Sequence, residues 1–359
     1  MSKDRLVIIP NTLEPYGQEL VHIMFFPNGF RFRFRFKEEW LGSEVVYRID
    51  MLDDMSGYIV LRDFESGKFI PIRKMKLISS QKIGNIFYFQ TELSDFFDLE
   101  SDDSQRLEQL KKFNEDFTQN TPISKNGNKP REHLNPLVFK TTQQFTLSNT
   151  TPHSASSPPG TEQWGNIIRE LQILPFYDGV QFLYLAEVRT AQGITPKIED
   201  GVWLLNTGEH YYLKLLQHVA SSKPIKYEEV KLVADEFALR AIKASHHVVG
   251  KYDVLELSFS TNNLSTDVKS FIGIVQRNEG AVENRIFVDI SIRAPRKKLY
   301  LSWAGLAIST VAYMSPSIIP LLDVYVNIGL TAELVKDLSL IGFTLSLVSI
   351  SAVSNKDQK

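Results

Sequence analysis

Two stretches without charged side chains near the C-terminus limit what this chain can fold into more than any other feature. Residues 299–322 form the first, of 24 residues, and a helix of that length rises about 36 Å, against about 30 Å for the hydrocarbon core of a bilayer. Residues 338–354 form the second, of 17 residues. Together they predict a two-helix transmembrane hairpin over 299–354. The alternative is a buried hairpin in a soluble domain, although soluble core helices rarely run so far without charge.

Positive residues flank the hairpin and predict its orientation. The juxtamembrane segment 293–298 contains the cations Arg293, Arg296, Lys297 and Lys298. Two more lysines lie in the tail 355–359, whereas the connecting loop has Lys336 as its one cation. Because cations stay on the cytoplasmic side, we expect two spans with both termini, and the bulk of the chain, in the cytoplasm. The N-terminal residues have too short an apolar core for a signal peptide.

Each uncharged stretch contains a pair of small residues four positions apart. Gly305 and Ser309 form the pair in the first stretch, and Gly342 and Ser346 form the pair in the second. Small residues at this spacing let helix backbones approach closely in lipid. The two pairs therefore predict the packing surface of the hairpin, with a chance occurrence as the alternative.

The sequence before the hairpin is mainly β in character. Short alternating runs of apolar and polar residues are separated by turn signals such as Asn28-Gly29 and Asp178-Gly179, which is typical of antiparallel sandwiches or barrels. Residues 148–163 contain no long hydrophobic side chain and predict a flexible linker. We therefore expect a mainly β fold, with two tandem antiparallel β-sandwich or barrel-like domains over 1–147 and 164–292.

Periodicity predicts individual elements. Residues 19–26, 30–37 and 170–176 are among the predicted strands. Residues 237–247 predict a helix. A second helix is predicted to start near residues 101–104, because an apolar stripe at helical spacing follows, made of Leu107, Leu110, Phe113 and Phe117.

The two predicted β-domains share short patterns in the same order, which predicts a duplication. Residues 26–34 and 176–184 both contain an aromatic residue, a turn with glycine and an alternating strand. Further matches pair 68–78 with 223–233, and the strand from Gly84 with that from Gly250. The alternative is that β-rich domains share such short patterns by necessity.

Motifs for catalysis are absent from the sequence. No cysteine occurs, which excludes a disulfide scaffold, a thiolate zinc site and a thiol nucleophile. Nucleotide-binding glycine loops, the nucleophile elbow and the zinc-protease motif are absent too. The adjacent pair His246-His247 is the one histidine cluster, and on a strand the two rings would point to opposite faces. We expect no catalytic residue, no metal and no cofactor.

The most distinctive local pattern alternates arginine with phenylalanine over residues 31–36. A period of two predicts a strand with one phenylalanine face, which must be core, and one arginine face. Arg31, Arg33 and Arg35 could bind an anionic ligand such as a phosphate group. Alternatively they pair with carboxylates on a neighbouring strand, such as Glu38, Glu44 or Asp50.

The leading functional prediction is a membrane-anchored cytoplasmic binding or sensing module without catalysis. Its expected partners are the lipid bilayer and a protein partner or a second copy of the chain, with a small anionic ligand besides. The net charge of −2 disfavours nucleic acid. One alternative is a membrane effector, in which ligand binding or assembly turns the hairpins into a pore or a bilayer defect, an architecture broadly similar to that of bacterial defence proteins. The other is an enzyme whose site is assembled from distant residues.

Overall fold

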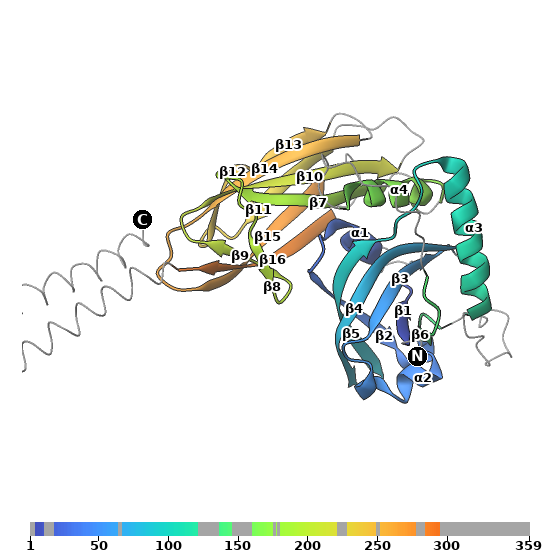
Figure 1. Cartoon of the computed structure of the whole chain (residues 1–359). Helices are drawn as coiled ribbons and strands as arrows, with labels where there is room; N and C mark the ends of the chain where they lie inside the picture. Colours follow the sequence, from blue (N-terminus) through green and yellow to red (C-terminus); the bar gives the residue numbers. More distant parts are fainter. Residues whose placement is uncertain are drawn as a thin grey trace, which may run out of the picture.

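A computed structural model describes residues 4–10, 18–63, 67–120, 136–145, 160–174, 177, 180–220, 228–248, 252–277 and 284–294. Over these residues the protein is mainly β, as predicted, and its strands form three sheets (Figure 1). No helix in this part of the chain is long and apolar enough to cross a membrane. The predicted hairpin 299–354, its Gly305–Ser309 and Gly342–Ser346 pairs, and the cations Arg296, Lys297 and Lys298 lie outside the described residues.

The N-terminal sheet is a curled half-barrel. Its strand order is β2-β5-β4-β3-β1-β6, and all neighbours are antiparallel except β1 and β3. The backbone after β2 curls back to the opposite edge, where the Gly42 N–H donates to the Val138 carbonyl of β6 at 2.8 Å. The strands are β1 (Arg5–Ile8), β2 (Arg31–Lys37), β3 (Ser56–Arg62), β4 (Phe69–Ile83), β5 (Ile86–Phe96) and β6 (Val138–Thr141).

Helices accompany the half-barrel. They are α1 (Gln18–Phe25), α2 (Ser43–Val46), α3 (Asp103–Asn120) and the short 3-10 helices η1 (Glu38–Trp40) and η2 (Ile49–Met51). Helix α3 confirms the predicted apolar stripe, since Phe113 and Phe117 are buried against the sheet, although Leu107 is exposed.

Helix α1 replaces the strand predicted over 19–26. That prediction was wrong because this segment is apolar on every side, and its side chains from Leu20 to Phe25 are buried except for His22. A short segment that is buried all round gives no periodicity to separate helix from strand.

Two further sheets form the C-terminal part, with strand orders β12-β14-β10-β7 and β13-β11-β15-β16-β9-β8. We call the second the β16 sheet. The pairings are antiparallel except for β16 with β9. The elements are α4 (Thr161–Gln172), β7 (Val180–Thr190), β8 (Lys197–Glu199), β9 (Val202–Asn206), β10 (His210–Ala220), β11 (Glu228–Ala234), β12 (Leu239–Lys243), β13 (Ser245–Val248), β14 (Tyr252–Thr261), β15 (Val268–Arg277) and β16 (Asn284–Arg293).

Two sequence predictions differ from this part of the structure. Residues 237–247 contain β12 and β13 rather than a helix, because pairing with β14 and β11 overrides the helix propensity of this alanine- and lysine-containing segment. Helix α4 starts at Thr161 and ends at Gln172, so it includes the end of the predicted linker 148–163 and the beginning of the strand predicted over 170–176.

Strand pairing does not support the predicted duplication. The matched segments of the N-terminal half, β4 and β5, are neighbours in one sheet. Their matched counterparts, β11 and β14, belong to different sheets. The shared patterns therefore do not correspond to one strand topology used twice.

The buried apolar residues of both parts join into one continuous cluster. All strands of the half-barrel come from residues 5–141, and all strands of the other two sheets from residues 180–293. Among the described strands none joins the two parts in a common sheet, so the parts meet through side-chain packing and polar contacts, with α1 lying against β7 (Figure 1).

Candidate functional site

Strand β2 contains the arginine–phenylalanine alternation. Phe34 is fully buried and Phe36 is nearly so, whereas the side chains of Arg33 and Arg35 are exposed. Their neighbours on β5 are Gln90 and Tyr88 rather than carboxylates. The Arg33 guanidinium lies 5.4 Å from the centroid of the Tyr88 ring, a cation–π contact that holds an arginine without neutralising it.

Arg31 differs from the other two arginines because it contacts the C-terminal part. Its guanidinium forms an ion pair with Asp200 at 2.9 Å. Asp200 and Gly201 form the tight turn between β8 and β9, with φ of 54° and 79°. A Cβ at Gly201 would lie 2.6 Å from the Arg31 Cγ, so glycine is needed there both for its left-handed backbone and for this close approach.

Two of the three carboxylates predicted to face the arginines, Glu38 and Glu44, have other partners. Glu38 pairs with Lys82 at 2.8 Å, and Glu44 accepts a hydrogen bond from the backbone N–H of Lys140 at 3.2 Å. The three arginines therefore share one strand face but differ in their surroundings. Arg31 lies at the contact between the half-barrel and the C-terminal part, which we call the junction, whereas Arg33 and Arg35 are exposed.

A fully buried arginine, Arg73, lies behind the junction. Its guanidinium donates to the carbonyls of Ile23 and Phe26 at 3.0 and 2.5 Å, to the Ser94 carbonyl at 2.9 Å and to the Asn28 side chain at 2.8 Å. Burial lowers the pKa of Arg73 to about 10, while Tyr184 and Asp95 oppose that shift. The arginine thereby satisfies carbonyls at the C-terminus of α1, where a cation is also favoured by the helix dipole.

Aromatic side chains join α1 and β5 to the C-terminal part. The Trp164 indole N–H of α4 donates to the Met24 carbonyl of α1 at 3.1 Å. The Tyr184 ring of β7 packs between Trp164 and Phe96, at 5.8 and 5.5 Å between centroids. Burial raises the pKa of Tyr184 although Arg73 lowers it, so this hydroxyl stays protonated at neutral pH.

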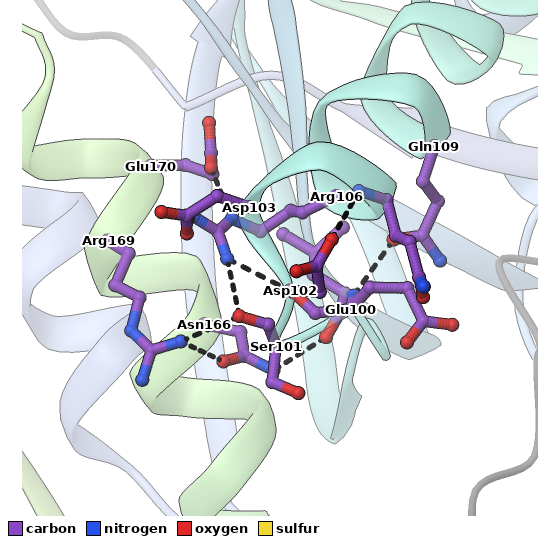
Figure 2. Close-up of polar contacts among 11 residues, drawn as sticks. Glu100, Ser101, Asp102, Asp103, Arg106, Gln109, Asn166, Arg169 and Glu170 are labelled. Atoms are coloured by element: carbon purple, nitrogen blue, oxygen red, sulfur yellow. Dashed lines mark hydrogen bonds and ion pairs between the residues drawn. The ribbon is translucent and has the colours of Figure 1, made fainter.

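Helices α3 and α4 meet in a polar cluster around Arg106 (Figure 2). Arg106 pairs with Glu170 of α4 at 2.5 Å, and the two side chains are only 5% and 7% exposed. The same guanidinium pairs with the exposed Asp103 at 2.5 Å and donates to the Glu100 and Ser101 carbonyls. Burial opposes the charge on Arg106, but its hydrogen bonds to Glu170 and Asp103 raise the pKa overall.

The remaining contacts of the cluster also connect α4 to the chain before α3. Asn166 donates to the Leu99 carbonyl at 2.6 Å, and Arg169 donates to the Ser101 carbonyl at 3.1 Å. The contacts that Glu170, Asn166 and Arg169 of α4 make with Arg106, Leu99 and Ser101 join residues 64 or more apart in the sequence. Their chemical role is to hold the two parts in one orientation.

The described residues contain no group of three or more histidine, aspartate or glutamate side chains placed to hold a metal ion. His246 and His247 lie at successive positions of β13, opposite Val230 and Glu229, so their rings leave the strand on opposite faces. Among the predicted topology residues only Arg293 is described, and it pairs with Glu199 at 2.6 Å at the end of β16.

No family model matches the sequence, and no curated protein does. A solved conjugative transposon lipoprotein from Bacteroides eggerthii is 6% identical with a TM-score of 0.20, over 29% of this chain and 94% of that chain. A Bacteroides ovatus GH5 xyloglucanase in complex with a XXXG heptasaccharide is 12% identical with a TM-score of 0.16, over 30% of this chain and 19% of that chain. Similarities at this level carry no argument about fold or function.

Proposed function

We propose that the protein is a membrane-anchored cytoplasmic binding or sensing module. In this proposal a barrel-like domain over 1–147 and a β-sandwich over 164–292 are held at the bilayer by the hairpin 299–354. The observation that carries the proposal is the place where the chain leaves its last described strand. Strand β16 ends at Arg293, and five residues separate it from the first uncharged stretch, which begins at Leu299.

The junction supports transmission of a binding event to that anchor. Arg31 of β2 pairs with Asp200 in the β8–β9 turn. Strand β9 in turn pairs with β16 through the Trp203–Ile290 to Asn206–Arg293 register. A continuous set of contacts thus runs from the arginine strand to the last described strand. We propose that Arg33 and Arg35, on the same face, receive an anionic ligand or an acidic protein surface.

The second candidate function is a membrane effector. Serines favour it, since both uncharged stretches contain several, among them Ser302, Ser309, Ser346 and Ser349, and polar side chains on one helix face can line a pore. In this version the same contacts transmit assembly of the β-domains to the hairpins.

Expression of the whole chain and of residues 1–292 separates these functions. An anchored binding module predicts that both forms leave growth and membrane potential unchanged, and that only the whole chain stays with membranes after alkaline extraction. An effector predicts loss of membrane potential with the whole chain alone. Recovery of the whole chain in the soluble fraction would contradict both.

A further inference from the structure

The outer face of the β16 sheet exposes an apolar patch, formed by Val233, Phe271 and Phe287. Their side chains are 46%, 39% and 53% exposed. Val233 and Phe287 lie in register on either side of Gly273, and a Cβ at Gly273 would lie 3.3 Å from the Phe287 ring. The two phenylalanine rings meet edge to face at 5.5 Å between centroids. The patch is therefore an ordered aromatic surface, and exposed paired phenylalanines call for a partner.

The charges around this patch are mainly positive. Strand alternation places five cations on the outer face among its described side chains, namely Lys197, Lys231, Lys269, Arg285 and Arg293, and three carboxylates, namely Glu199, Glu229 and Asp289. Two of the carboxylates already bridge cations of the same face, Glu229 with Lys231 at 3.0 Å and Glu199 with Arg293 at 2.6 Å. The face is thus basic on a chain whose net charge is −2.

The end of β16 limits how far this face can lie from the bilayer. Residues 294–298 span at most about 17 Å when extended, and three of these five residues are cations. The N-terminal half-barrel lies at the end of the sheet pair away from the end of β16 (Figure 1). It contacts the β16 sheet through Phe30 on Trp203 and Arg31 on Asp200, which leaves the patch uncovered.

We propose that the outer face of the β16 sheet docks on the surface of the membrane that anchors the chain. Phe271 and Phe287 lie at headgroup level, where aromatic side chains are favoured, and the cations face anionic lipid headgroups. The sheet lies flat on the bilayer, so the hairpin and the patch hold the β-domains at two places. This inference rests on the membrane anchoring proposed above.

Two valines with matched exposure test the docking. Val233→Cys reports on the patch, and Val254→Cys reports on the outer face of the four-stranded sheet, where Val254 is 44% exposed. The chain has no native cysteine, so each variant takes one environment-sensitive dye. The full chain is reconstituted in nanodiscs of phosphatidylcholine and phosphatidylglycerol that contain a headgroup-nitroxide lipid. We expect quenching of the dye at position 233 to exceed that at position 254 at least about twofold.

Further variants assign that quenching to the patch and its charges. In the Val233→Cys background, the changes Phe271→Ser and Phe287→Ser together should remove the excess quenching. Tyr252→Ser, at a 54% exposed position of the four-stranded sheet, should leave the excess quenching intact. Discs of phosphatidylcholine alone should reduce the quenching at position 233. Lys269→Gln with Arg285→Gln should reduce it in mixed discs as well.

Each contrary outcome has a definite meaning. Equal quenching at the two positions in a chain that is incorporated in the discs overturns the docking but not the anchoring. A blue-shifted dye at position 233 without lipid quenching overturns it in favour of a protein partner or a second copy. Equal quenching in discs with and without phosphatidylglycerol overturns the role of the cations. A chain that does not enter the discs contradicts the anchoring itself.

Discussion

The buried ion pair between Arg106 and Glu170 predicts which of two single variants loses more unfolding free energy, because the two side chains have different remaining partners. In Arg106→Met, the carboxylate of Glu170 stays behind at 7% exposure with its guanidinium partner gone. Breaking a buried pair in this way costs about 3–5 kcal/mol of unfolding free energy. In Glu170→Met, the guanidinium keeps Asp103 and the carbonyls of Glu100 and Ser101. The loss is then that of one charged hydrogen bond, about 1.5–3 kcal/mol.

The double variant completes the cycle. Arg106→Met with Glu170→Met leaves no buried charge at this contact, so it should be less destabilised than the sum of the single variants by about 1–3 kcal/mol. Arg169→Met is the matched control on α4. Arg169 is exposed and donates to Ser101 and Asn166 at 3.1 and 3.3 Å, and its removal should cost within about 1 kcal/mol.

Urea unfolding of the purified full chain in nanodiscs measures these differences, because two of the four tryptophans, Trp164 and Trp203, are buried in the β-domains and their emission changes when these unfold. A larger loss in Glu170→Met than in Arg106→Met would refute the account of the pair. Strict additivity in the double variant would also refute it, since it would mean that the two side chains do not interact in solution.

Four further predictions test other parts of the structure. Phe34→Ala should lower the free energy of unfolding by about 3–5 kcal/mol, since the side chain is fully buried. An unchanged urea midpoint would contradict the placement of β2. Burial lowers the pKa of His22 below its ordinary 6.5 despite a hydrogen bond with the Arg285 backbone. The unfolded chain therefore binds a proton first, and stability should fall as the pH drops below about 6.5; His22→Gln should flatten that part of the pH profile, and an unchanged profile would count against the partly buried position of His22. The proposed anion site predicts that the chain binds pyrophosphate, used as a probe. Arg33→Gln with Arg35→Gln should change the free energy of unfolding by no more than about 1 kcal/mol and abolish pyrophosphate binding measured by calorimetry, whereas retained binding would place the anion elsewhere. Proteolysis should first cut within 148–160, and the two fragments should co-elute on gel filtration because their apolar core is continuous; separate elution would contradict that core.

Local periodicity was enough to predict β2 and α3. The arginine–phenylalanine alternation has the strand period, and the stripe that includes Phe113 and Phe117 has the helix period. Helix α4 had a comparable signal, because Trp164, Ile167, Ile168 and Leu171 follow helical spacing and are all buried. The prediction instead assigned the start of this helix to the linker 148–163 and its end to a strand over 170–176.

The junction could not be predicted from local sequence. Arg73 occupies the same kind of alternating segment as its exposed neighbour Lys74, and only the approach of the α1 carbonyls makes it a buried cap. Arg106 and Glu170 are 64 residues apart, and their pairing depends on how α4 packs. Arg31 was singled out from the sequence, but its partner Asp200 lies 169 residues away, beyond the carboxylates that a strand-neighbour argument considers.

Membrane topology is the most direct test of the central claim that this protein is anchored by a C-terminal hairpin with its β-domains in the cytoplasm. The two variants are Asn327→Cys, in the loop between the uncharged stretches, and Ser354→Cys, at the end of the second. In intact cells an impermeant thiol reagent should label position 327 and not position 354, and both positions should react after the membrane is opened. Labelling of position 354 alone would reverse the topology, and no labelling of either position in intact cells together with a soluble chain would contradict the anchor.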